Sequence, residues 1–267
     1  LVPAIFCTFT NIAEDSNQSA ANHGTLMDSV RDFGGGVMTT LRNRAFRKVC
    51  LATFLVFNAF QVIAAFSWFI IVYYMNAGDP VAAGVWPTLF GSVGALFTCF
   101  LVIPVVNWCA QTYGKLNTFM VSQAVSLLGY IFLWWGFSPE NPWMMFIPLP
   151  LFSFGIGGLF TIMMSMTADI CDMDELETGE RREGTFGAIY WWMVKFGAAV
   201  AGAGSGLILS VIGFDQTVAI QSDETLSMLR LSYVLIPCIG TSIAIFVMRN
   251  YDLDEQKANE IRAQLDA

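Results

Sequence analysis

Six long apolar blocks constrain the fold of this chain more than any other feature of its sequence. Each block has about the 20 residues that a helix needs to cross the hydrocarbon core of a bilayer. Helices of a soluble bundle would show polar residues at every turn, and these blocks do not. With 55% hydrophobic and only 13% charged residues, the chain is predicted to have an all-α transmembrane fold rather than a soluble one. The blocks, which together form a six-helix transmembrane bundle over residues 49–248, are 49–74, 83–107, 116–137, 143–168, 185–212 and 228–248.

The segments outside the blocks are short and polar, except at the start of the chain. Residues 1–10 are apolar but too short to span a bilayer, and they lack the features of a signal peptide, so we interpret them as the end of a preceding transmembrane helix. Residues 11–48 are predicted to be a cytoplasmic linker, and residues 249–267 a cytoplasmic tail. This organisation predicts that the chain is the C-terminal part of a longer protein.

The basic residues predict the orientation of the chain in the membrane. Lys and Arg gather before the first block, at 108–115, at 169–184 and after the last block, whereas the loops at 75–84 and 138–142 have none. By the positive-inside rule, both ends of the bundle and the two basic loops are cytoplasmic. The net charge of −8 argues against a nucleic-acid partner.

Several kinds of chemistry have no sequence support. The six cysteines show no Cys-x-x-Cys pairing, and we expect them to be packing residues rather than metal ligands. No nucleophile elbow, zinc-protease motif or phosphate-binding glycine loop occurs. We therefore predict no catalytic residue, no metal site and no resident cofactor.

Lys195 is the strongest local signal, because it lies ten residues inside the fifth block, at about 15 Å from its start. A lysine near the bilayer centre costs roughly 2.5–3.5 kcal/mol on insertion scales. None of the six blocks contains an Asp or Glu that could pair with it. Its counter-charge is therefore a substrate, water in a cavity, or a carboxylate outside this chain. We favour a functional, cavity-facing lysine over a structural ion pair.

Aromatic residues precede this lysine at a depth where an interfacial belt is not expected. Trp191 is one helical turn before Lys195, and Tyr190 and Trp192 flank it. An aromatic surface beside a cation suits a polar ligand with an apolar face, such as a sugar. For Trp192, ordinary helix packing is the competing interpretation.

The stretch TADICDMDELETGERREGTFGAIYWWMVKFG, residues 167–197, resembles a signature of the glycoside-pentoside-hexuronide:cation symporters, the melibiose permease-like family of the major facilitator superfamily. The segments 41–48 and 227–237 resemble the starts of helices 7 and 12 of that family, so the resemblance covers the whole chain as helices 7 to 12. The residues that match the family pattern are Ala168, Asp169, Asp172, Glu175, Thr178, Gly179, Arg181, Arg182, Glu183, Gly184 and Lys195.

The resemblance implies a twelve-helix transporter, of which this chain is the C-terminal half. Such a protein moves a sugar together with Na⁺ or H⁺ by alternating access, usually in the bacterial inner (plasma) membrane. The coupling cation is then held in the N-terminal six-helix half, and the other expected partners are the sugar and membrane lipid. Lys195 matches the helix 11 lysine, and Phe160 lies near an aromatic position that contacts the sugar. Tryptophan is usual at Phe160 and a small polar residue at Trp191, which argues against galactosides as the substrate.

Five charged residues on the basic loop and its edges are candidates for a gate: Asp169, Asp172, Arg181, Arg182 and Glu183. They can pair with one another or with the N-terminal half. Exposed ion pairs contribute about 0–1 kcal/mol each, which suits a contact that must break in every cycle. The alternative is a solvated loop whose arginines only set the topology.

Three other functions remain open from the sequence. A lipid or lysolipid carrier of the same superfamily would also suit the aromatic fifth block. A membrane-embedded enzyme would need a nucleophile or paired carboxylates at membrane depth, and none is present. The third is a non-transporting membrane sensor or assembly subunit.

Overall fold

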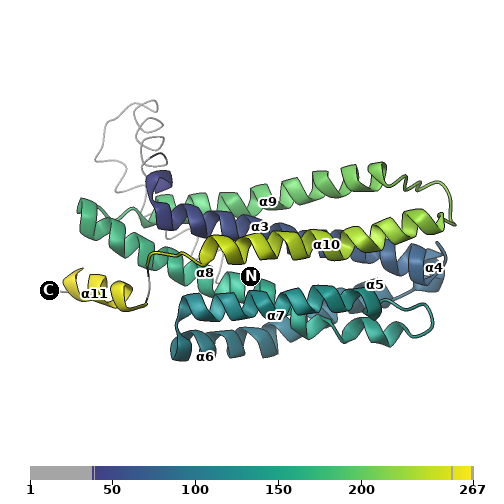
Figure 1. Ribbon diagram of the computed structural model, residues 1–267, viewed down its shortest axis with the longest axis horizontal. Helices are drawn as coiled ribbons and strands as arrows, with labels where there is room; N and C mark the ends of the chain where they lie inside the picture. Colours follow the sequence, from purple (N-terminus) through teal and green to yellow (C-terminus); the bar gives the residue numbers. More distant parts are fainter. Residues whose placement is uncertain (1–37, 39, 254, 266–267) are drawn as a thin grey trace, which may run out of the picture.

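A computed structural model describes residue 38 and the ranges 40–253 and 255–265, and within them every regular element is a helix (Figure 1). Six helical stretches are long and apolar enough to cross a bilayer, which confirms the predicted all-α transmembrane fold. The predicted end of an earlier helix at residues 1–10 lies outside the described residues, as does most of the predicted linker. The elements are α3 (Arg44–Phe69), η1 (Ile70–Met75), α4 (Pro80–Ala83), α5 (Trp86–Phe97), η2 (Thr98–Val102), α6 (Ile103–Tyr113), α7 (Lys115–Gly136), η3 (Pro142–Phe146), α8 (Leu149–Thr178), α9 (Glu183–Val211), α10 (Asp223–Met248) and α11 (Glu255–Leu265).

Several helices extend beyond the apolar blocks, because capping residues rather than hydropathy set where they begin and end. The Asn43 side chain accepts a hydrogen bond of 3.1 Å from the Phe46 N–H and so starts α3 before its apolar block. In the fourth span, α8 continues beyond the C-terminal end of its apolar block to Thr178. It stops where Gly179 adopts a left-handed conformation with φ of 72° and donates its N–H to the Glu175 carbonyl at 2.8 Å.

The second span is continuous but irregular. A π-helical turn, η2, joins α5 to α6, and Pro104 follows it within the first residues of α6. Proline cannot donate a backbone hydrogen bond, so the ladder is rearranged around it. Thr98 and Cys99 lie in this turn and line a cavity described below.

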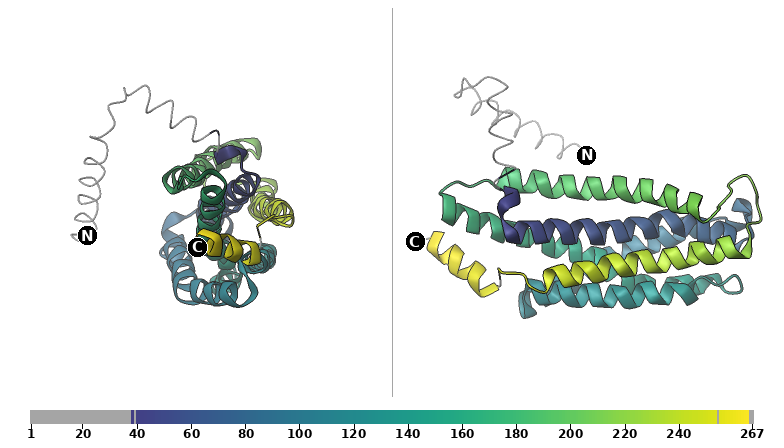
Figure 2. Two further views of the ribbon diagram at one scale, coloured as in Figure 1. Left: turned by 90° about the vertical axis from the view of Figure 1, so that its left-hand side faces the viewer. Right: turned by 45° about the horizontal axis from the view of Figure 1, so that its top comes forward.

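The centre of the bundle is α3, which packs against α8, α9 and α10, while α7 packs against α8 and α10. Figure 2 (left) looks along the bundle from the end that carries α11 and shows α9 and the α5–α6 pair on opposite sides of it. The helices on the outside are the least enclosed. Only 28% of the apolar window of α9 is buried, and only 17% of that of the second span. Their free faces are therefore available to lipid, to a ligand or to another part of a protein.

The contact between α7 and α8 depends on small residues. A Cβ atom on Gly129 would lie 2.4 Å from the Phe152 backbone nitrogen, and one on Gly158 would lie 2.8 Å from the Ser122 Cβ. These glycines allow the two backbones to approach closely, as small residues do in membrane helix pairs. Beside them, the Gln123 side chain donates a hydrogen bond of 3.0 Å to the Gly155 carbonyl.

Candidate functional site

Lys195 lies near the middle of α9, about 18 Å from its start at Glu183. Tyr190, Val194 and Gly197 are buried on the side of α9 that packs against α3, and Lys195 is exposed on the other side. Within residues 38–265 as far as they are described, its ammonium group has no ion pair or hydrogen bond. The charge is thus presented outward from the bundle, near the middle of a helix that is long and apolar enough to cross a bilayer.

Trp191 lies one turn before Lys195 and connects it to α8. Its ring stacks on that of Phe160, with centroids 6.2 Å apart and planes inclined by 24°. Phe160 in turn meets the edge of Phe57 on α3, at 6.0 Å between centroids. Since Trp191 remains 45% exposed, the stack offers an open aromatic surface beside the lysine.

Tyr190, which the sequence places among the solute-contacting residues, has a different position in the structure. Its side chain is fully buried in the core between α3, α8 and α9, and its ring meets Trp191 edge-on at 5.7 Å. It cannot reach the exposed face of α9. Trp192 is 57% exposed and stacks on Phe196 at 5.1 Å, next to Lys195 but away from Phe160. Tyr190 therefore lies behind Trp191, in the core of the described bundle.

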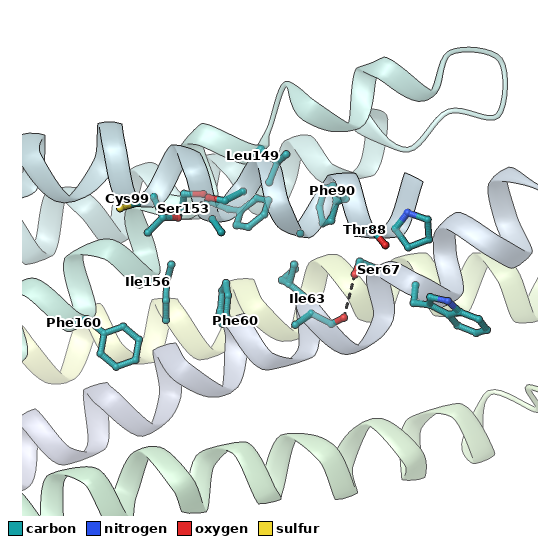
Figure 3. A pocket seen from close by; sticks show the side chains of 18 of the residues that line it. Phe60, Ile63, Ser67, Thr88, Phe90, Cys99, Leu149, Ser153, Ile156 and Phe160 are labelled. Atoms are coloured by element: carbon teal, nitrogen blue, oxygen red, sulfur yellow. Dashed lines mark hydrogen bonds between the residues drawn. The ribbon is translucent and has the colours of Figure 1, made fainter. Parts of the chain in front are cut away.

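A cavity of about 640 Å³ begins at Phe160 and extends between α3, α5 and α8 (Figure 3). In Figure 3, Phe60 and Ile63 of α3 face Phe90 of α5 and Ser153 of α8 across it, with Phe160 at one end. The lining is mainly apolar and contains no charged residue. The one ring of Phe160 therefore belongs both to this cavity and to the aromatic stack that leads to Lys195.

Asn58 is a polar residue of the first apolar block that sequence reasoning did not select. Its amide nitrogen is buried without a hydrogen-bond partner among the described residues. It lies against α9, only 3.3 Å from the position that a Cβ on Gly197 would occupy. A polar side chain at this depth was visible in the sequence, but only the structure places it at the α3–α9 contact.

The predicted gate residues lie at the end of the bundle that carries α11, and they are already paired within this chain. The Asp169 carboxylate, 7% exposed, contacts the Lys115 ammonium of α7 at 2.5 Å and the Arg262 guanidinium of α11 at 3.6 Å. Asp172 contacts Arg262 at 3.2 Å and Arg181 at 3.5 Å. We call these five residues, Lys115, Asp169, Asp172, Arg181 and Arg262, the charged cluster.

The two adjacent arginines of the α8–α9 loop differ strongly. Arg181 is 54% exposed and bonds Glu175 at 2.8 Å and Glu183 at 3.1 Å. Arg182 is 16% exposed and holds both oxygens of Asp174, at 2.8 and 2.5 Å, in a bidentate pair. Asp174 was not among the predicted residues, and it makes Arg182 a brace of the loop rather than a free gate residue.

Hydrogen bonds to carboxylates stabilise the charged form of these two arginines. The bonds to Glu175 and then Glu183 raise the pKa of Arg181 above its ordinary value. The bond to Asp174 raises the pKa of Arg182 in the same way, against the opposing effect of burial. Both ion pairs therefore favour the charged guanidinium, the form that arginine has at physiological pH in any case.

No group of three or more His, Cys, Asp or Glu side chains that could hold a metal ion occurs in the described part of the chain. The cysteines described there, Cys50, Cys99, Cys109, Cys171 and Cys238, are all unpaired thiols. The polar groups described above are a cation midway along α9, beside aromatic rings, and a separate charged cluster at one end of the bundle. This arrangement can bind and orient a solute, and it contains no assembled nucleophile and base.

Comparisons with known proteins find relatives among sugar transporters. The isoprimeverose transporter of Lactiplantibacillus pentosus is 28% identical over 61% of this chain and 34% of its own length. The glucuronide carrier protein homolog of Escherichia coli (strain K12) is 26% identical over 86% of this chain and 49% of its own length. The putative sulfoquinovose importer of the same organism is 27% identical over 81% of this chain and 44% of its own length.

The chain spans at most about half the length of these curated relatives. The family model described as MFS/sugar transport protein matches residues 1–255, nearly the whole chain. The relatives are carriers and importers, not enzymes, and the six membrane-length helices fit a multi-pass membrane protein. By sequence and by architecture, this chain belongs to the MFS/sugar transport protein family.

Proposed function

We propose that this chain is one six-helix half of a secondary active sugar transporter, which moves a sugar together with Na⁺ or H⁺ by alternating access. The exposed mid-membrane Lys195 beside the Phe160–Trp191 stack carries the proposal. Sugars combine hydroxyl groups with apolar ring faces, so a cation that donates hydrogen bonds and an aromatic surface together suit them. The relatives are named as transporters, carriers or importers of sugar derivatives.

The coupling cation would bind in the other half of the transporter. No Asp or Glu lies in the apolar blocks of this chain, so no carboxylate at the depth of Lys195 is available here to exchange a proton or bind Na⁺. Paired halves with a site between them near the bilayer midplane are the usual architecture of such transporters. In this arrangement, the exposed face of α9 borders the central passage, and the membrane is the bacterial inner membrane with the charged cluster on its cytoplasmic side.

The charged cluster fits a cytoplasmic gate. Because several of the predicted gate residues are paired within this chain, fewer of them are available to pair with the other half. Asp169 is held by Lys115 and Arg262, and Arg182 by Asp174, so these contacts hold the end of this half together. Arg181 and Glu183, exposed by 54% and 65%, lie outside these bracing contacts and would exchange partners with the other half during a cycle.

The proposal is tested with Lys195→Ala in the intact transporter, in proteoliposomes with an imposed ion gradient. Losing the hydrogen bonds of a charged group, worth about 3 kcal/mol, should lower the kcat/KM for sugar uptake about 100-fold while membrane insertion is unchanged. Trp192→Ala is the matched control, because Trp192 is exposed on the same helix but does not join the stack on Phe160. Normal uptake by the Lys195 variant would remove this lysine from the mechanism.

The apolar cavity favours one alternative, a carrier of lysolipids or similar amphiphiles. Competition separates the two functions in the same proteoliposomes. Simple sugars should inhibit uptake through a sugar transporter, whereas only lysolipids should inhibit uptake through a lipid carrier.

A further inference from the structure

The cavity behind Phe160 has the wrong chemistry for a second sugar ring. Its lining has four hydroxyl groups and no charged group. Two of the four are already bonded to carbonyls of their own helices: Ser67 to Ala64 at 3.1 Å and Thr98 to Gly94 at 2.8 Å. Figure 3 shows the bond of Ser67 as a dashed line to its own helix, α3. Buried sugar hydroxyls without partners would cost several kcal/mol, so the cavity selects against them.

The size and position of the cavity suit an apolar group attached to a sugar. An engineered cavity of about 150 Å³ is enough to bind benzene, and this one has about 640 Å³. It adjoins the aromatic stack through the shared ring of Phe160. A ligand that crosses Phe160 would place its polar part at Trp191 and Lys195, and its apolar part between α3, α5 and α8.

We propose that the cavity between α3, α5 and α8 holds the apolar aglycone, the non-sugar part, of a glycoside whose sugar ring lies at Trp191 and Lys195. This inference rests on the proposed function and makes the substrate an aryl or alkyl glycoside rather than a free sugar. Burial of a phenyl ring in place of a methyl group should tighten binding at least about tenfold, because a large apolar surface leaves water.

Gly91 offers a way to fill the cavity without disturbing its walls. It lines the cavity from α5, and a Cβ atom built on it meets nothing within 4 Å. Gly91→Leu should therefore occupy the space of the aglycone, while Gly91→Ala leaves most of it free. Gly204→Leu is the matched control, because Gly204 on α9 also has open space around its Cβ position but does not line the cavity. Ala64→Leu fills the cavity from the opposite wall on α3 and guards against a folding defect of one variant.

The experiment measures how methyl and phenyl β-D-glucosides, β-D-xylosides and β-D-glucuronides compete for uptake by the intact transporter in proteoliposomes. For at least one sugar, the phenyl glycoside should bind about tenfold more tightly than the methyl glycoside. Gly91→Leu and Ala64→Leu should abolish this advantage and leave the methyl glycoside unaffected. Gly91→Ala and Gly204→Leu should keep it.

Two results would overturn the proposal. Equal affinity for methyl and phenyl glycosides in the unmodified protein would leave sugar transport standing and remove the aglycone site. An equal loss of both ligands in Gly91→Leu and Ala64→Leu would show that another part of the transporter covers this face. If no simple sugar and no glycoside of any pair competes or enters, the proposed function itself is wrong, and the aglycone site falls with it.

Discussion

The ring of Phe160 on α8 stacks on the ring of Trp191 on α9, 6.2 Å away between centroids, and this pair is the link between the apolar cavity and Lys195. The two helices otherwise have few contacts near the site, because α9 packs mainly against α3. Packing on α3 therefore positions the lysine-bearing helix, and the stack is its aromatic link to α8 and the cavity. A solute bound at Lys195 would meet the ring of Trp191 on the side that leads to the cavity, which gives that ring an orienting role.

Trp191→Ala should raise the KM for sugar uptake about tenfold, because the loss of one aromatic face costs on the order of 1–1.5 kcal/mol of ligand contact. Trp191→Phe should restore most of the affinity, since a ring still stacks on Phe160. The measurement is the KM of uptake in proteoliposomes, at equal amounts of inserted protein. A change in kcat alone, with the KM unaltered, would contradict a role in ligand contact.

The surroundings of Lys195 and Trp191 show which features of the site could be predicted from the sequence. The depth of Lys195 and its separation by one turn from Trp191 followed from helix geometry, and hydropathy located six spans. Hydropathy does not say which side of an apolar helix faces its neighbours, and so Tyr190, next to Trp191, was expected at the ligand and lies in the core. The same limit hid the contact of Asn58 with α9.

The partners in the charged cluster could not have been read from the sequence either. Charges gathered near the α8–α9 loop indicated pairing, but many pairings were possible among them. Arg262 reaches Asp169 and Asp172 only because the short α11 continues past the end of α10 and lies beside the projecting end of α8, as Figure 1 shows. That placement depends on the turn after α10 and on tertiary contacts, neither of which has a local signature.

Arg182→Ala should lower the free energy of unfolding by about 2–4 kcal/mol, because it leaves the Asp174 carboxylate, only 8% exposed, without its partner. Arg181→Ala should cost less than about 1 kcal/mol, since that side chain is 54% exposed and its pairs are screened by solvent. Thermal unfolding of the two variants in the same detergent provides the comparison. Equal stability of the two would show that the bidentate pair does not brace the loop.

The junction between the last span and α11 should respond to acid. The Lys48 ammonium donates a hydrogen bond of 3.1 Å to the Asp252 carboxylate, which lowers the pKa of that carboxyl below its ordinary value of 3.8. A lowered pKa in the folded state means that the contact contributes its stability above pH 3.8 and loses it as the pH falls through the folded pKa. Protection of α10–α11 junction amides from hydrogen exchange should therefore drop below a pH of about 4.

Asp252→Asn is the control for that pH dependence. The variant should show weaker protection at pH 7 and little further loss on acidification, because its side chain no longer titrates. If the unmodified protein and this variant lost protection in parallel, another carboxylate would be responsible. Asp169 and Asp172, which hold α11 through Arg262, would then be the groups to replace.

Gly129→Ala should destabilise the protein by about 1–3 kcal/mol, the usual cost of overpacking a tight contact. The added Cβ would lie 2.4 Å from the Phe152 backbone nitrogen and 2.9 Å from the Leu151 carbonyl carbon, so α7 and α8 would have to move apart. Gly202→Ala on α9 is the matched control, because its Cβ position has nothing within 4 Å and alanine favours the helix. We expect Gly202→Ala to unfold at the temperature of the unmodified protein or slightly above it, whereas Gly129→Ala unfolds several degrees lower. A Gly129 variant as stable as the Gly202 variant would mean that the α7–α8 contact is looser than its backbone separation indicates.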